Sequence, residues 1–120
     1  MLIRTADHGE LLGAHGGLHQ KWFTLYDEAT RVPFQVVRIG ETPTKKITVT
    51  ETPTSHVDLV PTALAMAGLD QDGLVERLAP SFTELHPLPG RDLSPLIDGQ
   101  KAGENLDTRA VYILSLIHIC

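Results

Sequence analysis

Residues 5–21 read TADHGELLGAHGGLHQK and gather three histidines, two carboxylates, four glycines and one lysine. The apolar stretch over 2–6 that precedes them has the character of a strand end. Glycine at this density favours a loop, because each glycine weakens a regular element. We therefore predict a strand that enters a glycine-rich loop from Asp7 to about Gly17, with metal-capable and anion-capable side chains just beyond the strand.

The residues after this loop alternate between helical and strand-like patterns. Apolar side chains at helical spacing predict a helix from Gln20 to Thr30, with Trp22, Phe23 and Tyr26 in the core. Pro33 ends that helix, because proline disfavours helical geometry in the residue before it. Three further strand-like segments are predicted over 34–39, 46–50 and 110–114.

The second half of the sequence carries signals for helix boundaries. Ser55 is predicted to be an N-cap, with Asp58 as its capping-box partner. Pro61 is predicted to kink this helix or to mark a restart, and Gly68 to end it in a left-handed conformation. Shorter helical segments are predicted around 73–79 and over 92–97, with Gly99 closing the second.

The order of these segments indicates the α/β class and suits part of an α/β sandwich. Two to four strands are available, and so small a sheet would leave long unpaired edges. The sequence therefore predicts an incomplete α/β fold.

The composition narrows the classes of function. The chain of 120 residues is 42% hydrophobic and 21% charged, close to the average for globular proteins. Its net charge of −5 and the lack of a basic patch argue against a general nucleic-acid-binding protein. Its longest apolar run is far shorter than the roughly 20 residues that cross a bilayer, so no membrane span is predicted. The single cysteine, Cys120, has no partner for an internal disulfide.

Asp7 and His8 are the first candidates for a functional site, because ligands of open α/β sheets gather beyond strand ends. A carboxylate oxygen and an imidazole nitrogen on one sharp turn can both approach a divalent cation, and Gly9 removes bulk where the backbone turns. The carboxylate suits Ca²⁺, Mg²⁺ or Mn²⁺, whereas the imidazole favours Mn²⁺ or Zn²⁺. Two ligands make only part of a tight site. The alternative is an ordinary turn with an exposed acid.

Lys21, His15 and His19 are candidates for binding a substrate. Lys21 begins the predicted helix, where backbone N–H groups and the helix dipole already favour an anion such as sulfate or phosphate. A solvent-exposed lysine is the alternative. His15 and His19 have the spacing of a zinc pair, but Gly16 and Gly17 disfavour the helix that such a pair requires. Substrate contact or hydrogen bonding within the loop is expected for both histidines.

Three ordered motifs resemble the sulfatase family of the alkaline phosphatase superfamily. The stretch TADHGELLGAHGGLHQKWFTLYDEATRVPF, over 5–34, is similar to part of the second half of a sulfatase. The stretch TSHVDLVPTALAMAGLD, over 54–70, matches the family pattern S-x-x-D-(L/I)-x-P-T-x-L-x-x-x-G, and GRDLSPLIDG, over 90–99, resembles the segment that follows it. The resemblance covers roughly residues 2–114 and implies a partial alkaline-phosphatase-like α/β sandwich.

The resemblance also implies an activity, the hydrolysis of small sulfate esters, with phosphate or phosphonate esters in some branches. The nucleophile of the family is a formylglycine made from a C/S-x-P-x-R motif. A divalent cation, commonly Ca²⁺ and in some branches Mn²⁺, holds that group and the ester oxygens. By position, Asp7 and His8 match the late metal-ligand pair, in the Asp-His form of the choline-sulfatase and phosphonate-monoesterase branch. Lys21 matches the lysine that contacts the sulfate, whereas His15 and His19 have no firm counterpart.

The sequence departs from the family pattern in ways that indicate a fragment. It contains neither a C/S-x-P-x-R motif nor the early Asp-Asp ligand pair, and no residue follows Cys120 to complete such a motif. We therefore expect residues 1–114 to be a fragment of a sulfatase catalytic domain that is inactive alone. Residues 115–120 resemble translated adapter sequence and are expected to be a non-native tail. The alternative is a genuine final strand, because isoleucine and leucine suit strands.

Two other functions remain open at this stage. The first keeps the fold but changes the substrate to a phosphonate or a phosphodiester. The second is a small non-catalytic domain whose Asp-His-Gly loop binds a metal or an anion for structure alone. The sequence leaves the oligomeric state open.

Overall fold

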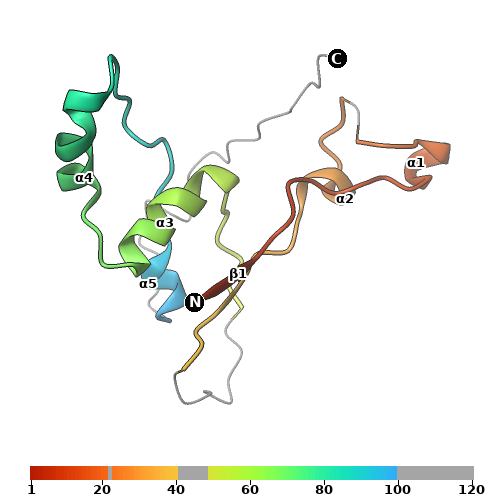
Figure 1. Ribbon diagram of the computed structural model, residues 1–120. Helices are drawn as coiled ribbons and strands as arrows, with labels where there is room; N and C mark the ends of the chain where they lie inside the picture. The colour runs from red at the N-terminus through yellow and green to blue at the C-terminus, as the bar shows by residue number, and fades with distance from the viewer. Residues whose placement is uncertain (22, 41–48, 100–120) are drawn as a thin grey trace. The chain divides into compact units, whose positions relative to one another are not determined.

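The computed structural model of the chain describes residues 1–21, 23–40 and 49–99. In chain order the elements are β1 (Leu2–Arg4), α1 (Ala14–Gly17), α2 (Asp27–Thr30), β2 (Gln35–Val37), η1 (His56–Asp58), α3 (Leu59–Met66), α4 (Gln71–Leu78), η2 (Ala79–Ser81) and α5 (Ser94–Ile97) (Figure 1). They belong to two compact units, the first with the described residues up to 40 and the second with residues 49–99. The strand predicted over 110–114 and the tail over 115–120 lie outside the described residues, as does most of the strand predicted over 46–50.

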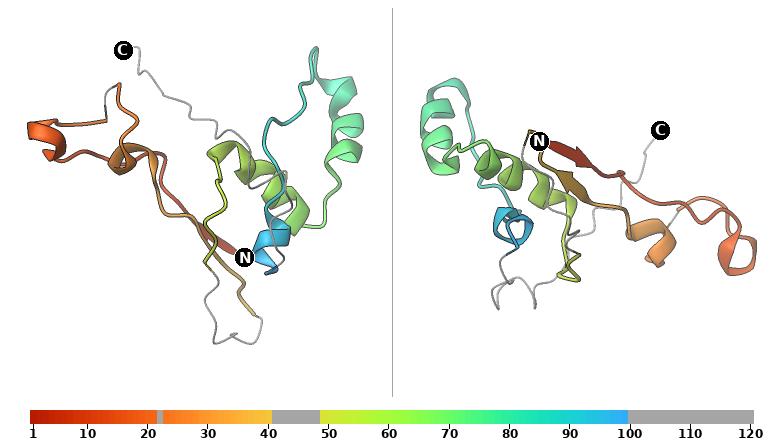
Figure 2. Two further views of the ribbon diagram at one scale, coloured as in Figure 1. Left: turned by 180° about the vertical axis from the view of Figure 1, so that it is seen from behind. Right: turned by 90° about the horizontal axis from the view of Figure 1, so that it is seen from below.

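The first unit contains a two-stranded antiparallel sheet, in which Leu2 pairs with Val37, Ile3 with Val36 and Arg4 with Gln35. Figure 2 shows the two strands side by side, with the loop and α2 forming the connection between them. The sheet confirms the strands predicted over 2–6 and 34–39, although both are shorter than expected. The described residues thus combine helices with a small sheet, and the larger α/β sandwich stays a prediction.

The helix predicted from Gln20 to Thr30 is wrong for most of its length, since the only helical part of this stretch that the structure describes is α2. The cause is local backbone geometry: Gln20 has a φ of 68° and Phe23 a φ of 54°. Residues in this left-handed region cannot continue a right-handed helix. Phe23 is 80% exposed and Tyr26 is 44% exposed, so the predicted core position of these rings is also wrong. Trp22 lies outside the described residues.

The loop after β1 is held against α2 by a close backbone contact. The N–H of Gly9 donates a hydrogen bond to the carbonyl oxygen of Ala29, at 2.9 Å. A Cβ at Gly9 would overlap the carbonyl oxygen of Glu28, so this approach requires glycine. Leu11 and Ala29 are buried and form the small apolar centre of this unit.

The second unit confirms the predicted helix boundaries. Ser55 and Asp58 form the capping box at the start of η1, which leads directly into α3. Pro61 lies in the first turn of α3. Backbone N–H groups in the first turn make no hydrogen bond within the helix, so proline is tolerated there. Gly68 has a φ of 70°, and its N–H and that of Leu69 donate to carbonyls near the end of α3, as in a Schellman motif.

The core of the second unit is built around two buried polar side chains of η1 and α3, Asp58 and Thr62. The Thr62 hydroxyl donates to the carbonyl oxygen of Asp58, at 2.6 Å, and accepts from the N–H of Leu93, at 2.9 Å. Leu93 and Leu96 supply the buried apolar side chains. A Cβ at Gly90 would overlap the carbonyl oxygen of Val57, so the segment before α5 lies directly against η1.

The remaining helical predictions for the second unit are confirmed. The helix expected around 73–79 is α4, and the turn expected over 92–97 contains α5 and is followed by Gly99, with a φ of 78°. Asp70 caps α4 by accepting a hydrogen bond from the N–H of Gly73. Within residues 1–21, 23–40 and 49–99, no helix has the length and apolar character that a membrane crossing requires.

Candidate functional site

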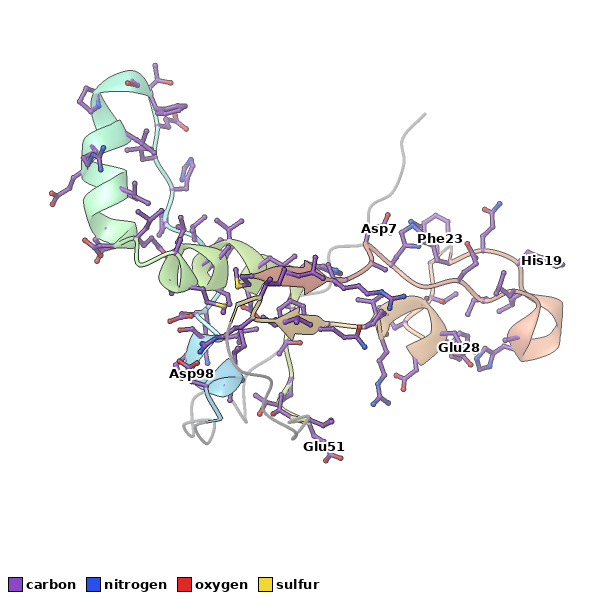
Figure 3. All side chains as sticks on the ribbon, turned by 60° about the horizontal axis from the view of Figure 1, so that its bottom comes forward. Asp7, His19, Phe23, Glu28, Glu51 and Asp98 are labelled. Atoms are coloured by element: carbon purple, nitrogen blue, oxygen red, sulfur yellow. The ribbon has the colours of Figure 1, made fainter. Side chains whose placement is uncertain are left out.

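Asp7 and His8 lie just beyond the end of β1, where the chain enters the glycine-rich loop. Figure 3 shows Asp7 at this position. The Asp7 side chain is 77% exposed and that of His8 is 33% exposed. Oδ1 of Asp7 accepts a hydrogen bond from the N–H of His8, at 3.0 Å, which fixes the carboxylate beside the ring. The strand end therefore presents both side chains from a defined local turn.

The imidazole of His8 has one nitrogen bound to the backbone and the other directed at Asp7. Its Nδ1 lies 2.7 Å from the carbonyl oxygen of Gly9, and a carbonyl can only accept, so Nδ1 carries a proton. Its Nε2 lies 3.2 Å from Oδ2 of Asp7. In the neutral ring, Nε2 offers a lone pair to the same space as the carboxylate oxygen. Such an arrangement is stabilised by a positive charge shared between the two atoms, either a proton or a cation.

The charge state of Asp7 follows from its neighbours. Desolvation alone raises the pKa of this carboxyl, but the hydrogen bond from the His8 N–H and the charges of His8 and Lys21 together lower the pKa below its usual value. Asp7 is therefore an anion at neutral pH. Of these causes, the charge of Lys21 is the weakest.

The donor chemistry of Asp7 and His8 fits two ligands of a divalent cation. Carboxylate oxygen and neutral imidazole nitrogen are both common ligands, and the hydrogen bond from Nδ1–H to the Gly9 carbonyl is the kind that orients a metal-binding histidine. In the part of the chain that the structure describes, no cluster of three or more His, Cys, Asp or Glu residues could hold a metal ion. Asp7 and His8 can thus supply part of a coordination sphere, and they do not fill it.

The loop beyond this site departs from ordinary backbone geometry. Four non-glycine residues of the described chain have a φ in the left-handed region, and all of them lie between residues 12 and 23: Leu12, His15, Gln20 and Phe23. Residues in this region are strained by about 1–3 kcal/mol each, and such residues cluster at functional sites. Thr24, which directly follows Phe23, has a buried hydroxyl oxygen without a hydrogen-bond partner among the described residues.

The two loop histidines have different surroundings. The His15 ring is stacked on the ring of Tyr26, with centroids 3.7 Å apart and planes inclined by 8°. Its Nε2 lies 3.1 Å from Oε2 of Glu28, and hydrogen bonding to His15 lowers the pKa of the Glu28 carboxyl. His19 is exposed, and Figure 3 shows it well apart from Asp7. His15 thus contacts α2, outside the loop that carries it.

Sequence reasoning missed the partners of His15. Tyr26 was expected in the core, yet it contacts the loop, as does Glu28. The contact between His15 and Glu28 spans 13 residues of chain, and periodicity within one element carries no information about it. The structure alone reveals the left-handed backbone of His15, a conformation that histidine adopts more readily than most residues.

Comparison with known proteins places these residues in context. A family model described as Sulfatase matches residues 1–69 of the chain. A protein of Escherichia coli (strain K12) described as "Uncharacterized sulfatase YidJ" is 39% identical over 70 residues, which cover 58% of this chain and 13% of that protein. The chain thus matches only a small part of the length of this relative. No solved structure matches the chain.

Proposed function

Since the chain belongs to the sulfatase family, we propose that it supplies part of the active site of a metal-dependent sulfuric ester hydrolase. In this proposal Asp7 and His8 are two ligands of a divalent cation, with Ca²⁺ the first choice and Mn²⁺ the second. Lys21 donates to an oxygen of the ester sulfate. His19 and His15 belong to the loop that borders the substrate, a small sulfate ester.

The observation that carries this proposal is the geometry of the Asp7–His8 pair. Oδ2 and Nε2 are 3.2 Å apart, a separation at which one cation can bind both atoms. The hydrogen bond to the Gly9 carbonyl holds the ring in the tautomer whose Nε2 carries the lone pair. The match with the family model includes both residues, which supports their assignment to the metal-ligand pair.

The residues of this chain would act by binding and by charge. A bound cation would supply positive charge that stabilises developing negative charge on the ester oxygens. Asp7 and His8 would orient that cation, and Asp7 would do so as an anion, as its lowered pKa indicates. Lys21 would bind a sulfate oxygen as a point charge, since an ammonium group donates in three directions without a fixed plane. The positive Lys21 would therefore complete an anion site beside the cation.

The nucleophile is proposed to come from outside this sequence. The chain contains no C/S-x-P-x-R motif from which a formylglycine could form. We therefore expect residues 1–114 to be inactive alone and to act within a longer polypeptide. The exposed apolar side chains of the first unit, including Leu12 and Phe23, agree with further contacts in a larger domain.

Calorimetric titration of the chain with Ca²⁺, Mn²⁺ and Zn²⁺ tests the metal site. Weak binding is expected because two ligands form only part of the site, and Asp7→Asn and His8→Gln should each abolish it. Asp27→Asn and His86→Gln make the same chemical changes elsewhere, at exposed ion pairs, and should leave the binding unchanged. Equal binding by all of these variants would overturn the proposal. Tight binding coupled to cooperative folding would instead support a structural metal-binding domain.

Activity of the longer protein tests the reaction. Asp7→Asn in a protein that carries this sequence together with a C/S-x-P-x-R motif should lower kcat/KM for a sulfate ester by more than about 100-fold, because even indirect disturbance of a metal ligand has effects near this size. Turnover of a phosphonate ester or a phosphodiester in preference to the sulfate ester would favour the alternative substrate class. Unchanged sulfatase activity in the variant would refute the assigned ligand role.

A further inference from the structure

The loop that joins the two proposed binding groups is attached to α2 at two places. The first attachment directly follows His8, where the N–H of Gly9 donates to the carbonyl of Ala29 and the Gly9 Cα lies against the Glu28 backbone. This contact fixes the start of the loop. It leaves open how the far end of the loop, which carries Lys21, is held in place.

The second attachment is the side chain of His15. Its ring is stacked on Tyr26, the residue before α2, and paired with Glu28 within α2. The stack places the rings 3.7 Å apart and nearly parallel, and the Nε2–Oε2 distance is 3.1 Å. One side chain thus makes two different contacts to the same short helical segment.

The part of the loop around His15 is closed by backbone hydrogen bonds, which tie His15 to its neighbours. The N–H of Gly13 donates to the carbonyl of Leu18, at 2.9 Å, and the N–H of Leu18 donates to the carbonyl of Ala14, at 3.0 Å. Leu11, at the start of this segment, is buried. Lys21 follows three residues after Leu18, so there is little chain between the anchored segment and the lysine.

We propose that His15 is a positioning residue, which fixes the loop on α2 so that Lys21 is held beside Asp7 and His8. The inference rests on the proposed function, because it assigns His15 to the placement of the proposed anion-binding lysine relative to the proposed metal ligands. Asp7 and His8 are held by β1 and by the Gly9 contact, whereas Lys21 depends on the far end of the loop. Release of His15 would therefore move Lys21 without displacing the ligand pair.

The residue type at position 15 suits this role. The backbone has a φ of 52°, a left-handed conformation in which histidine is several-fold enriched. The imidazole is flat and can stack, and it also has a ring nitrogen that can pair with a carboxylate. A phenylalanine could make only the stack, and a lysine could make only the ion pair.

Paramagnetic relaxation by Mn²⁺ measures the proposed placement on the full 120-residue chain. A small amount of MnCl₂ added to isotope-labelled protein should enhance relaxation at the amides of Asp7 and His8, which reports binding of the ion. Enhancement at the amide and ε-methylene of Lys21 reports its distance from the ion, because the effect falls with the sixth power of distance. Weak binding is sufficient for this measurement, since exchange spreads the effect over all molecules.

The variant His15→Ala should reduce the enhancement at Lys21 severalfold while that at Asp7 and His8 stays as in the unaltered chain. Glu28→Gln, which keeps the size of the side chain but not its charge, should cause a smaller reduction. Tyr26→Phe keeps the stacked ring and should have no effect. Asp27→Asn is the control for Glu28→Gln, since it also removes one negative charge from α2. Asp27 pairs with Arg31 and not with His15, so this variant should leave the Lys21 enhancement unchanged.

The outcomes separate this inference from the proposed function. Absence of enhancement at Asp7 and His8 in the unaltered chain would refute the metal site itself. Normal enhancement there, with a Lys21 value that does not fall in His15→Ala, would refute the positioning role alone. The amide shifts of β1 and β2 in each variant show whether the first unit is still folded. If His15→Ala disrupts the sheet, the test of the positioning role is the comparison of Glu28→Gln with Asp27→Asn. Equal relaxation enhancement at Lys21 in these two variants would overturn the inference.

Discussion

The carboxylate of Asp58 accepts a hydrogen bond from the backbone N–H of Arg91, with Oδ1 and N 2.9 Å apart, across 33 residues of chain. Its other oxygen, Oδ2, accepts from the N–H of Ser55, at 2.8 Å. Asp58 has no exposed surface. One carboxylate thus serves as a helix cap and as the attachment point of the segment before α5, so the second unit should depend strongly on it.

Asp58→Ala should destabilise the second unit by about 3 kcal/mol, because it leaves two part-buried N–H groups without the buried side chain that accepts from both. Urea unfolding followed by circular dichroism measures this change. Asp70→Ala is the matched control, since Asp70 also caps a helix but does so at the surface, where the loss is about 1 kcal/mol. Equal losses in the two variants would show that the contact with Arg91 contributes nothing beyond capping.

Thr62→Val should destabilise the second unit by about 1–3 kcal/mol, although threonine and valine have nearly the same shape. The substitution removes the hydroxyl that accepts from Leu93, and the buried N–H of Leu93 is left unpaired. Thr30→Val is the control, because the hydroxyl of Thr30 donates only a local, exposed hydrogen bond to the carbonyl of Tyr26. This substitution should change the free energy of unfolding by no more than about 0.5 kcal/mol. Hydrogen exchange at Leu93 should become faster in Thr62→Val only.

Gly9→Ala should separate the loop from α2, since the added Cβ would overlap the carbonyl of Glu28. Overpacking of this kind costs about 1–3 kcal/mol, and here it also breaks the hydrogen bond from Gly9 to Ala29. The expected result is a loss of protection of the Gly9 amide in hydrogen exchange. Gly13→Ala is strained by its φ of 93° but meets no neighbouring atom, so protection at Gly9 should survive in that variant.

The features that sequence reasoning predicted are those set by nearby residues. The capping box of Ser55 and Asp58 needs only a spacing of three residues, and the turn at Gly68 needs only a residue that tolerates a positive φ. The strands were recognised from β-branched and apolar composition. The Asp7–His8 pair was predicted to share one turn because the residues are adjacent and follow a strand, and the structure brings their side chains together.

The features that sequence reasoning missed depend on contacts between distant segments or on backbone strain. Apolar spacing from residue 20 to 30 favoured a helix, yet the left-handed backbone of Gln20 and Phe23 prevents one. The contact from Thr62 to Leu93 spans 31 residues, and the contact from His15 to Glu28 spans 13. Neither leaves a periodic signal, because each joins two elements whose separation is set by the fold. Local rules thus predicted the ends of elements better than their contacts.

The ionisation of Glu28 gives a prediction about pH. The side-chain hydrogen bond from His15 is the main cause that lowers the pKa of this carboxyl below its usual value. A carboxyl whose pKa is lower in the folded state stabilises the fold at pH values above its unfolded pKa. That contribution is lost as the pH falls through the folded pKa, because the carboxyl is then protonated in both states. Acidification should therefore weaken the attachment of the loop to α2.

Titration of the Glu28 carboxyl carbon by NMR measures this effect directly. The midpoint should lie below that of an unperturbed glutamate in the unaltered chain and return towards it in His15→Ala. Tyr26→Phe retains the stacked ring and the imidazole partner, so its midpoint should stay low. The dependence of unfolding free energy on pH should be shallower in Glu28→Gln over the acidic range in which Glu28 titrates. A midpoint that does not move in His15→Ala would show that the helix environment, and not the imidazole, sets the ionisation of Glu28.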